Sequence, residues 1–317
     1  MTEVLTGLDS GNRERIAALR AQGRFFWLDA SLSETSREEL VDTLEIPEPA
    51  VRGPSRVHAD RESVDFVLRC YVPIDRPAEE AAYRLTPIPV QVVVTSDYLL
   101  TLHEERVALP EVLAVDLPQG RSKGYVVYSV LDAMLVSTSD ALEEVELSLD
   151  DLAASLAGGG AGSLPRESLQ TPVARLTTMR RWVRAEQAVF QRVGLDIGAL
   201  SGFDEPEERY VDRLDEQADR LLGSIDAASN AMGMVLDLQL NERAYLVSVV
   251  ATIFVPLTFI TGFFGMNFGW MVDRVDTPVA FWLLGFVVPA VTAALSWRFL
   301  VRRFVIGDRS ARSRRTT

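Results

Sequence analysis

The chain has 317 residues, a formal net charge of −13 at pH 7, 48% apolar residues and a mean hydropathy of +0.10. The acidic balance argues against a nucleic-acid-binding protein, the apolar content excludes a disordered acidic chain, and the single cysteine, Cys70, excludes an intramolecular disulfide and a thiolate metal cluster. A positive mean hydropathy in a chain with 24% charged residues indicates two unlike regions.

Residues 1–156 are predicted to form a mixed α/β domain. Short β-branched or aromatic runs bounded by turn residues predict strands, and apolar residues at helical spacing predict helices. The strands are Arg24–Ala30, Ser63–Val72, Pro89–Thr95 and Tyr98–His103, and the helices are Ser36–Leu44 and Gly124–Leu156. The segment is long enough to bury a core of its own, but the order of its strands does not follow from the sequence.

A glycine-rich segment, Ala157–Ser163, follows this domain. A phosphate-binding loop and a flexible turn between two helices are the competing interpretations. The Lys-Ser/Thr pair of a P-loop does not follow the glycines, and no clear strand precedes them, which favours the turn.

Residues 164–243 are predicted to form long helices. The stretch Ser168–Gly194 has an apolar stripe at helical spacing. A second helix begins near Pro206 and meets no other proline until Pro256. Its apolar positions recur every three or four residues, which is typical of a helix packed against other helices. Continued from Glu205 to Phe264, this helix would be about 90 Å long.

Two segments near the C-terminus contain no charged residue, Ala244–Met266 and Thr277–Trp297. About 20 apolar residues cross the hydrocarbon core of a bilayer, so both segments are long enough to span a membrane. We therefore predict transmembrane helices at 244–266 and 277–300, joined by an extracytoplasmic loop at 267–276. A pair of buried core helices is the alternative.

Charge on either side of the two segments predicts the topology. The loop contains Arg274 alone, whereas the chain from residue 298 onward contains seven arginines. These are Arg298, Arg302, Arg303, Arg309, Arg312, Arg314 and Arg315. The positive-inside rule places the basic tail, 301–317, in the cytoplasm, and an even number of spans then places residues 1–243 there as well.

The first apolar segment ends in Gly265-Met266-Asn267, preceded by TIFVPLTFITGFF. Here the chain resembles the CorA family of divalent-cation channels, whose signature is this tripeptide after the first of two C-terminal transmembrane helices. The resemblance is strong from about Asn241 to Phe268 and weaker over the rest of the chain. It implies a funnel-shaped homopentamer in the inner membrane, with an α/β cytoplasmic domain, long helices and a two-helix membrane hairpin. Its partners would be lipid, divalent cations and copies of itself, and not nucleic acid.

One face of the long helix is small or polar, whereas its other faces carry Ile, Phe and Leu. Counted back from Asn267 at helical spacing, this predicted pore stripe consists of Thr258, Val255, Ala251, Val247 (or Ser248), Ala244, Asn241, Asp237 and Asn230. Two spans cannot enclose an aqueous path, so several chains would have to contribute helices to a ring. Ordinary helix–helix packing in a membrane also favours small residues and is the alternative.

By resemblance, Gly265, Met266 and Asn267 form the selectivity filter. Mg²⁺ dehydrates reluctantly and keeps several waters, so a ring of Asn267 amide oxygens would bind the hydrated ion through those waters. Gly265 would permit the turn that ends the helix. The alternative is a plain helix terminus without a binding role.

Mg²⁺ is the expected cargo, with Co²⁺ and Ni²⁺ as further candidates, entering down the electrochemical gradient. A zinc transporter like the ZntB branch is the alternative, because Gly269 stands where the family often has Glu. The two spans contain no His, Cys, Asp or Glu, the usual zinc ligands, which favours Mg²⁺. Ala244 and Val247 stand where the family often has Met and Leu, so the position of a hydrophobic gate is open.

The resemblance also implies regulation by cytoplasmic Mg²⁺. The candidate ligands, clustered where the long helix begins, are Asp204, Glu205, Glu207 and Glu208. A solvated acidic first turn, favoured by the helix dipole, is the alternative. No permanently bound cofactor is expected.

Enzyme motifs do not appear in the sequence. The only histidines are His58 and His103, and there is no G-x-S-x-G, H-E-x-x-H or Walker lysine. The chain is therefore predicted not to be an enzyme. A two-span membrane sensor is the remaining competitor, and it predicts that Asn267→Ala leaves function intact.

Overall fold

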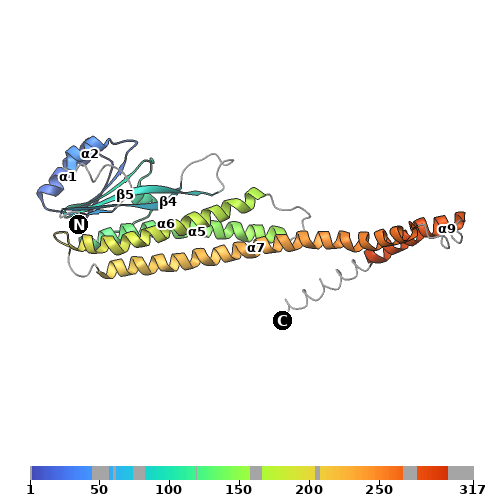
Figure 1. Cartoon of the computed structure of the whole chain (residues 1–317). Coiled ribbons are helices and arrows are strands. Elements are labelled where there is room, and N and C mark those ends of the chain that lie inside the picture. The colour runs from blue at the N-terminus through green and yellow to red at the C-terminus, as the bar shows by residue number, and fades with distance from the viewer. Residues whose placement is uncertain are drawn as a thin grey trace. The chain divides into compact units, whose positions relative to one another are not determined.

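The computed structural model describes residues 2–44, 57–59, 62–73, 83–118, 120–157, 166–203, 208–266 and 277–298. The chain divides into two compact units, Met1–Val235 and Leu236–Thr317. The first unit contains the α/β domain together with the packed parts of three long helices (Figure 1).

A six-stranded mixed sheet in the order β1-β2-β6-β5-β4-β3 lies at the centre of the first unit. Its strands are β1 (Glu3–Thr6), β2 (Phe26–Ser31), β3 (His58–Ala59), β4 (Ser63–Pro73), β5 (Leu85–Thr95) and β6 (Tyr98–His103). β1, β2 and β6 are parallel, whereas β6, β5, β4 and β3 pair antiparallel. The four strands predicted from the sequence are confirmed as β2, β4, β5 and β6.

One face of the sheet packs against α1 (Ser10–Ala21) and α2 (Arg37–Leu44), which lie on the same side of the strands in Figure 1. Successive side chains of a strand point to opposite faces, so alternate residues of β2 enter this core, beginning with Phe26. The members contributed by the strands are Leu5, Phe26, Leu28, Ala30, Val93, Tyr98, Leu100 and Leu102. At the start of α1, Asp9 accepts a hydrogen bond from the Asn12 amide at 2.7 Å and so caps the helix.

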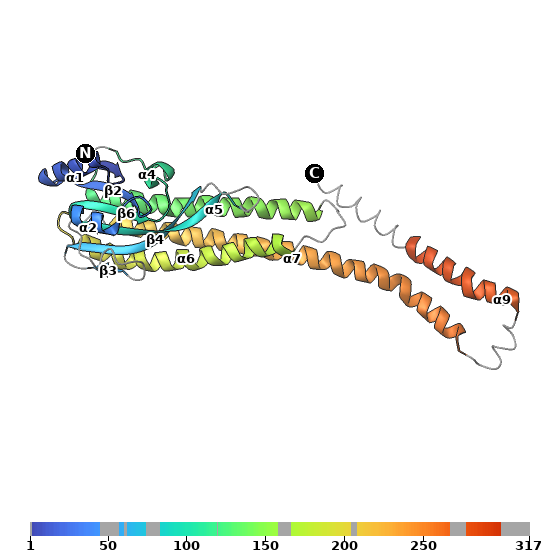
Figure 2. The same cartoon turned by 90° about the horizontal axis from the view of Figure 1, so that it is seen from above.

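The opposite face carries α5 (Lys123–Ala157) and α6 (Arg166–Gly198), with the first part of α7 (Glu208–Phe264) packed along them (Figures 1 and 2). α7 buries a seam of residues three or four apart, as its sequence predicted. The seam consists of Leu214, Ala218, Leu221, Ile225, Ala228, Met232 and Val235. The predicted helices 36–44, 124–156 and 168–194 are confirmed as α2, α5 and α6. The continuous helix predicted at 205–264 is confirmed over the described range 208–264.

Polar pairs fix the antiparallel register of α6 and α7. Arg180 Nη2 lies 2.9 Å from Asp226 Oδ1, and Gln187 Nε2 donates to Asp219 Oδ1 at 2.7 Å. Gln191 Nε2 donates to Asp215 Oδ1 at 3.0 Å. The glycine-rich residues after Ala157 lie outside the described part of the chain, so their predicted turn stays a prediction.

At Gly194, α6 packs against α7 so closely that there is no room for a side chain. A Cβ atom added to Gly194 would clash with Cγ2 of Val211 and lie 2.8 Å from its Cγ1. Overpacking of this kind costs about 1–3 kcal/mol, so Gly194→Ala is expected to lower the free energy of unfolding by that amount, measured by urea denaturation. The double variant Gly194→Ala/Val211→Ala should recover most of the loss.

Gly223 in α7 provides the matched control, because a Cβ added there meets no atom within 4 Å. Gly223→Ala should leave stability unchanged or raise it by up to about 1 kcal/mol through the higher helix propensity of alanine. Equal losses for Gly194→Ala and Gly223→Ala would contradict the packing argument.

The second unit contains the rest of α7, α9 (Pro278–Trp282), a π-helical turn η2 (Leu283–Val287) and helical residues 288–298. Searched over the described residues, the structure shows no helix with both the length and the apolar content needed to cross a membrane. The predicted loop 267–276 and tail 301–317 lie outside the described residues.

Candidate functional site

The predicted pore stripe lies along one face of α7. Asn230, Asp237, Asn241, Ala244, Val247, Ala251, Val255 and Thr258 are all described, and all are exposed. At about 100° per residue, Asp237 lies half a turn around the helix from Ala228, which belongs to the buried seam. At its start the stripe therefore lies opposite the buried seam of α7, and all eight of its side chains are exposed among the described residues.

The stripe offers oxygen acceptors. Thr258 Oγ1 donates to the Phe254 carbonyl at 2.8 Å, and Thr252 Oγ1, beside the stripe, donates to the Ser248 carbonyl at 2.8 Å. A hydroxyl has one proton and two lone pairs, so both oxygens retain lone pairs that can accept a hydrogen bond. The water molecules around a hydrated cation donate such bonds.

Pro256 adds an acceptor that the sequence reasoning missed. This proline lies inside α7, and proline has no N–H. It therefore cannot donate to the carbonyl of Thr252, which lies four residues earlier and beside the stripe. The proline itself was the signal in the sequence that would have identified this carbonyl.

The filter residues are described in part. α7 ends at Phe264; the Gly265 amide then donates to the Thr261 carbonyl at 2.9 Å, and the Met266 amide donates to the Phe263 carbonyl at 3.3 Å. A Cβ added to Gly265 would lie 3.0 Å from the Thr261 oxygen. The glycine is thus suited to this turn by close backbone approach rather than by a positive φ. Asn267 lies outside the described residues.

The candidate regulatory ligands are also described only in part. Asp204, Glu205 and Glu207 lie outside the described residues, and of Glu208 only the backbone, at the start of α7, is described. The described residues hold no group of three or more His, Cys, Asp or Glu side chains that could bind a metal ion.

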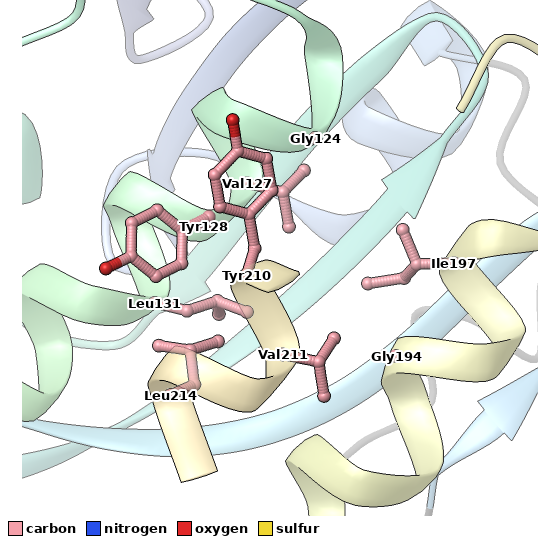
Figure 3. A pocket seen from close by; sticks show the side chains of 9 residues that line it. All are labelled: Gly124, Val127, Tyr128, Leu131, Gly194, Ile197, Tyr210, Val211 and Leu214. Carbon is pink, nitrogen blue, oxygen red and sulfur yellow. The ribbon is translucent and has the colours of Figure 1, made fainter. Parts of the chain in front are cut away.

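A small cavity of about 30 Å³ lies where α5, α6 and α7 meet in the first unit (Figure 3). It is lined by Gly124, Val127, Tyr128, Leu131, Gly194, Ile197, Tyr210, Val211 and Leu214. The rings of Tyr128 and Tyr210 stack with their centroids 4.9 Å apart, and Figure 3 shows both phenol oxygens pointing away from the aliphatic side chains. This volume holds about one water molecule, and the apolar lining offers no ligands for a cation.

The second unit exposes large apolar side chains. On α7, Phe254 is 62% exposed and Val255 67%. Beyond residue 277, Val279 is 75% exposed and Leu295 62%, and the ring of exposed Trp282 lies 4.9 Å from that of Phe286. Extended apolar surfaces mark contact with other chains or with membrane.

Comparison with known proteins gives a family match. A family model described as "CorA-like Mg2+ transporter protein" matches residues 22–303. The zinc transport protein ZntB of Pectobacterium atrosepticum is 22% identical over 220 residues, which is 66% of this chain and 66% of that protein. The ZntB of an Enterobacter species is 27% identical over 182 residues, 54% of each chain. The chain thus matches less than two thirds of the length of these relatives, 66% of the first and 54% of the second.

Solved structures establish the likeness of fold. The full-length CmaX protein superposes with a TM-score of 0.56 at 19% identity, covering 87% of both chains. The complete CorA magnesium transporter from Methanocaldococcus jannaschii gives 0.55 at 19% identity, covering 87% of this chain and 90% of that one. The cytoplasmic domain of ZntB from Vibrio parahaemolyticus gives 0.52 at 10% identity, covering 69% and 88%.

Proposed function

We propose that copies of α7 form a pore through which Mg²⁺ enters the cell, because the chain belongs to the CorA-like Mg²⁺ transporter family. The family makes the chain a divalent-cation transporter rather than an enzyme. The proposal of a Mg²⁺ pore is supported by the exposed stripe of small and polar residues on α7, which leads to Gly265 and Met266. Co²⁺ and Ni²⁺ are further candidate ions.

Two opposite requirements support a ring of several chains. The stripe from Asn230 to Thr258 carries oxygen atoms that need water or an ion as a partner. The opposite face is apolar and needs to be kept from water; Leu257 lies on it, about 200° around the helix from Val255. A homo-oligomer with the stripe inward and the apolar face outward satisfies both, because lipid covers the outside. We take the number of copies to be five and the spans to be 244–266 and 277–300, with both termini in the cytoplasm of a cell whose inner membrane holds the protein.

The chemistry of the stripe favours a hydrated ion. Its side chains are amides, a hydroxyl and aliphatic groups, and its one carboxylate, Asp237, is exposed. One Asp237 from each copy would gather negative charge around the axis and raise the local concentration of cations. Hydroxyl and amide oxygens bind the waters of Mg²⁺ without stripping them. At the mouth, Asn267 would select the ion, and Mg²⁺ bound by Asp204, Glu205, Glu207 and Glu208 would close the pore.

A zinc transporter like ZntB is the second candidate. It is favoured by the relatives described above, which are zinc transport proteins. The sequence from 244 to 266 contains no His, Cys, Asp or Glu, and Zn²⁺ is ordinarily held by such side chains. This absence is why Mg²⁺ is placed first.

Cysteine substitution tests the proposed pore face. Ala251→Cys and Val255→Cys lie on the stripe, so a membrane-impermeant charged thiol reagent is expected to block most cation uptake by these variants in liposomes. Leu257→Cys, on the opposite face, is the matched control and should keep its uptake. The natural Cys70 is buried and can stay in place. If the reagent blocked uptake only by Leu257→Cys, or by none of the three variants, the stripe would not line the pore.

A further inference from the structure

Glu186 is a buried carboxyl group without a cationic partner among the described residues. It lies on α6 and is 4% exposed. Its Oε1 accepts a hydrogen bond from the backbone amide of Arg69 on β4 at 2.9 Å. The Arg69 guanidinium does not form an ion pair with this carboxyl. It lies over the ring of Trp182, 4.7 Å from the ring centroid, and Trp182 precedes Glu186 by one turn of α6.

The hydrogen bond accepted by Glu186 lies at the edge of β4 that, beyond β3, no described strand pairs with, here called the free edge of β4. β4 pairs with β5 along its whole length, whereas among the described residues a strand, β3, pairs with the other edge of β4 only at Val64 and Asp65. Beyond these two residues, the Arg69 amide is bound by Glu186 of α6, and the Tyr71 amide is bound by Ser137 Oγ of α5 at 2.9 Å. Unpaired edges invite non-native strand pairing, so these two side chains hold the helices where the edge needs cover.

The surroundings of Glu186 oppose its negative charge. Burial raises the pKa of Glu186 to about 7, and the Arg69 amide and guanidinium only partly offset this. The neighbouring titratable groups on β4 are Cys70 and Tyr71, and burial raises the pKa of each to about 12, so both are neutral near pH 7. The charge of Asp29 on β2 also raises the pKa of Cys70, whereas the charge of Arg175 on α6 lowers the pKa of Tyr71. α5 presents the uncharged Ser137 at this edge.

We infer that Glu186 is a proton-binding site, and that loss of its proton near neutral pH loosens α6 from the free edge of β4. A carboxylate buried without a cation costs free energy, so the deprotonated chain favours states in which water reaches Glu186. Because the pKa is higher in the folded chain than in water, the stabilisation is complete below about pH 4.5, declines as the pH rises through 7, and is constant above it. The inference does not rest on the proposed function.

Hydrogen exchange measured by mass spectrometry on the full-length protein tests the inference. After correction for the intrinsic exchange rate, peptides covering β4 and the middle of α6 should lose protection about tenfold between pH 6 and pH 8. Glu186→Gln should remove this dependence on pH. Glu143→Gln replaces an exposed carboxyl group on α5 and should keep it. Peptides from α1, on the other face of the sheet, should not change.

Three results would overturn the inference. The first is unchanged protection of β4 in the unmodified chain, a result that needs no variant to fold. The second is an equal loss of protection in Glu186→Gln, because another group would then be responsible. The third is an equal loss in the α1 peptides, because the change would then be global rather than confined to α6 and β4.

Discussion

Asn267→Ala is expected to reduce Mg²⁺ uptake into liposomes to the level of liposomes without protein. In the proposed pore, each copy contributes one Asn267 amide to a ring, and the hydrated ion is recognised by hydrogen bonds from its waters to those oxygens. Alanine removes the acceptor from every copy at once. The measurement is the initial rate of uptake, with the oligomer checked by size-exclusion chromatography.

Gln170→Ala is the matched control, because it removes an exposed amide from α6, a helix that does not belong to the proposed pore. This variant should transport at the unmodified rate. Normal uptake by Asn267→Ala would contradict the filter and would favour a two-span sensor, for which this residue has no role.

Asp29→Ala is expected to lower the free energy of unfolding by about 3 kcal/mol or more. Asp29 on β2 is 1% exposed. Its Oδ1 accepts a hydrogen bond from the Thr101 hydroxyl at 2.6 Å. Its Oδ2 accepts one at 2.9 Å from the backbone amide of Leu109, the first residue of α4 (Leu109–Val112). His103 Nε2 lies 3.3 Å from Oδ1, and Trp27 Nε1 donates to Thr101 Oγ1 at 3.0 Å. Alanine would strand buried donors, each costing about 1–3 kcal/mol.

Urea denaturation of the full-length protein, followed by tryptophan fluorescence, measures this loss. Asp42→Ala, which removes an exposed carboxylate from α2, should change stability by less than about 0.5 kcal/mol. Equal midpoints for Asp29→Ala and the unmodified chain would show that the cluster around Asp29 does not hold β2, β6 and α4 together.

The strands that the sequence predicted are those long enough to show a pattern. β2 and β6 have six residues each and β4 and β5 have eleven, whereas β1 has four and β3 two. α1 was also missed, because among its many polar residues only Ile16 and Leu19 are buried. The placement of β2 beside β6 depends on pairs such as Trp27 with Leu99, and no local pattern encodes such distant contacts.

The same division separates the stripe on α7 from the buried Glu186 on α6. The small and polar residues of the stripe can be recognised in the sequence because they follow the helical period of α7, and their role in a pore stays a prediction. Glu186 could not be recognised, because the sequence Arg184-Ala185-Glu186-Gln187 looks like a solvated helix face. Its burial comes from β4, whose Arg69 lies 117 residues earlier in the chain. Asp29 was missed for the same reason, since its partners lie on β6 and α4.

Cation uptake into liposomes containing the purified full-length protein tests whether the chain forms a pore for Mg²⁺. Mg²⁺, Zn²⁺ and Co²⁺ are compared under a membrane potential, inside negative, with no proton gradient. A divalent cation gains about 4.6 kcal/mol per 100 mV, at about 2.3 kcal/mol per charge. We expect Mg²⁺ uptake that rises with the potential and needs no proton gradient. Zn²⁺ uptake that requires a proton gradient, with no uptake of Mg²⁺, would contradict it.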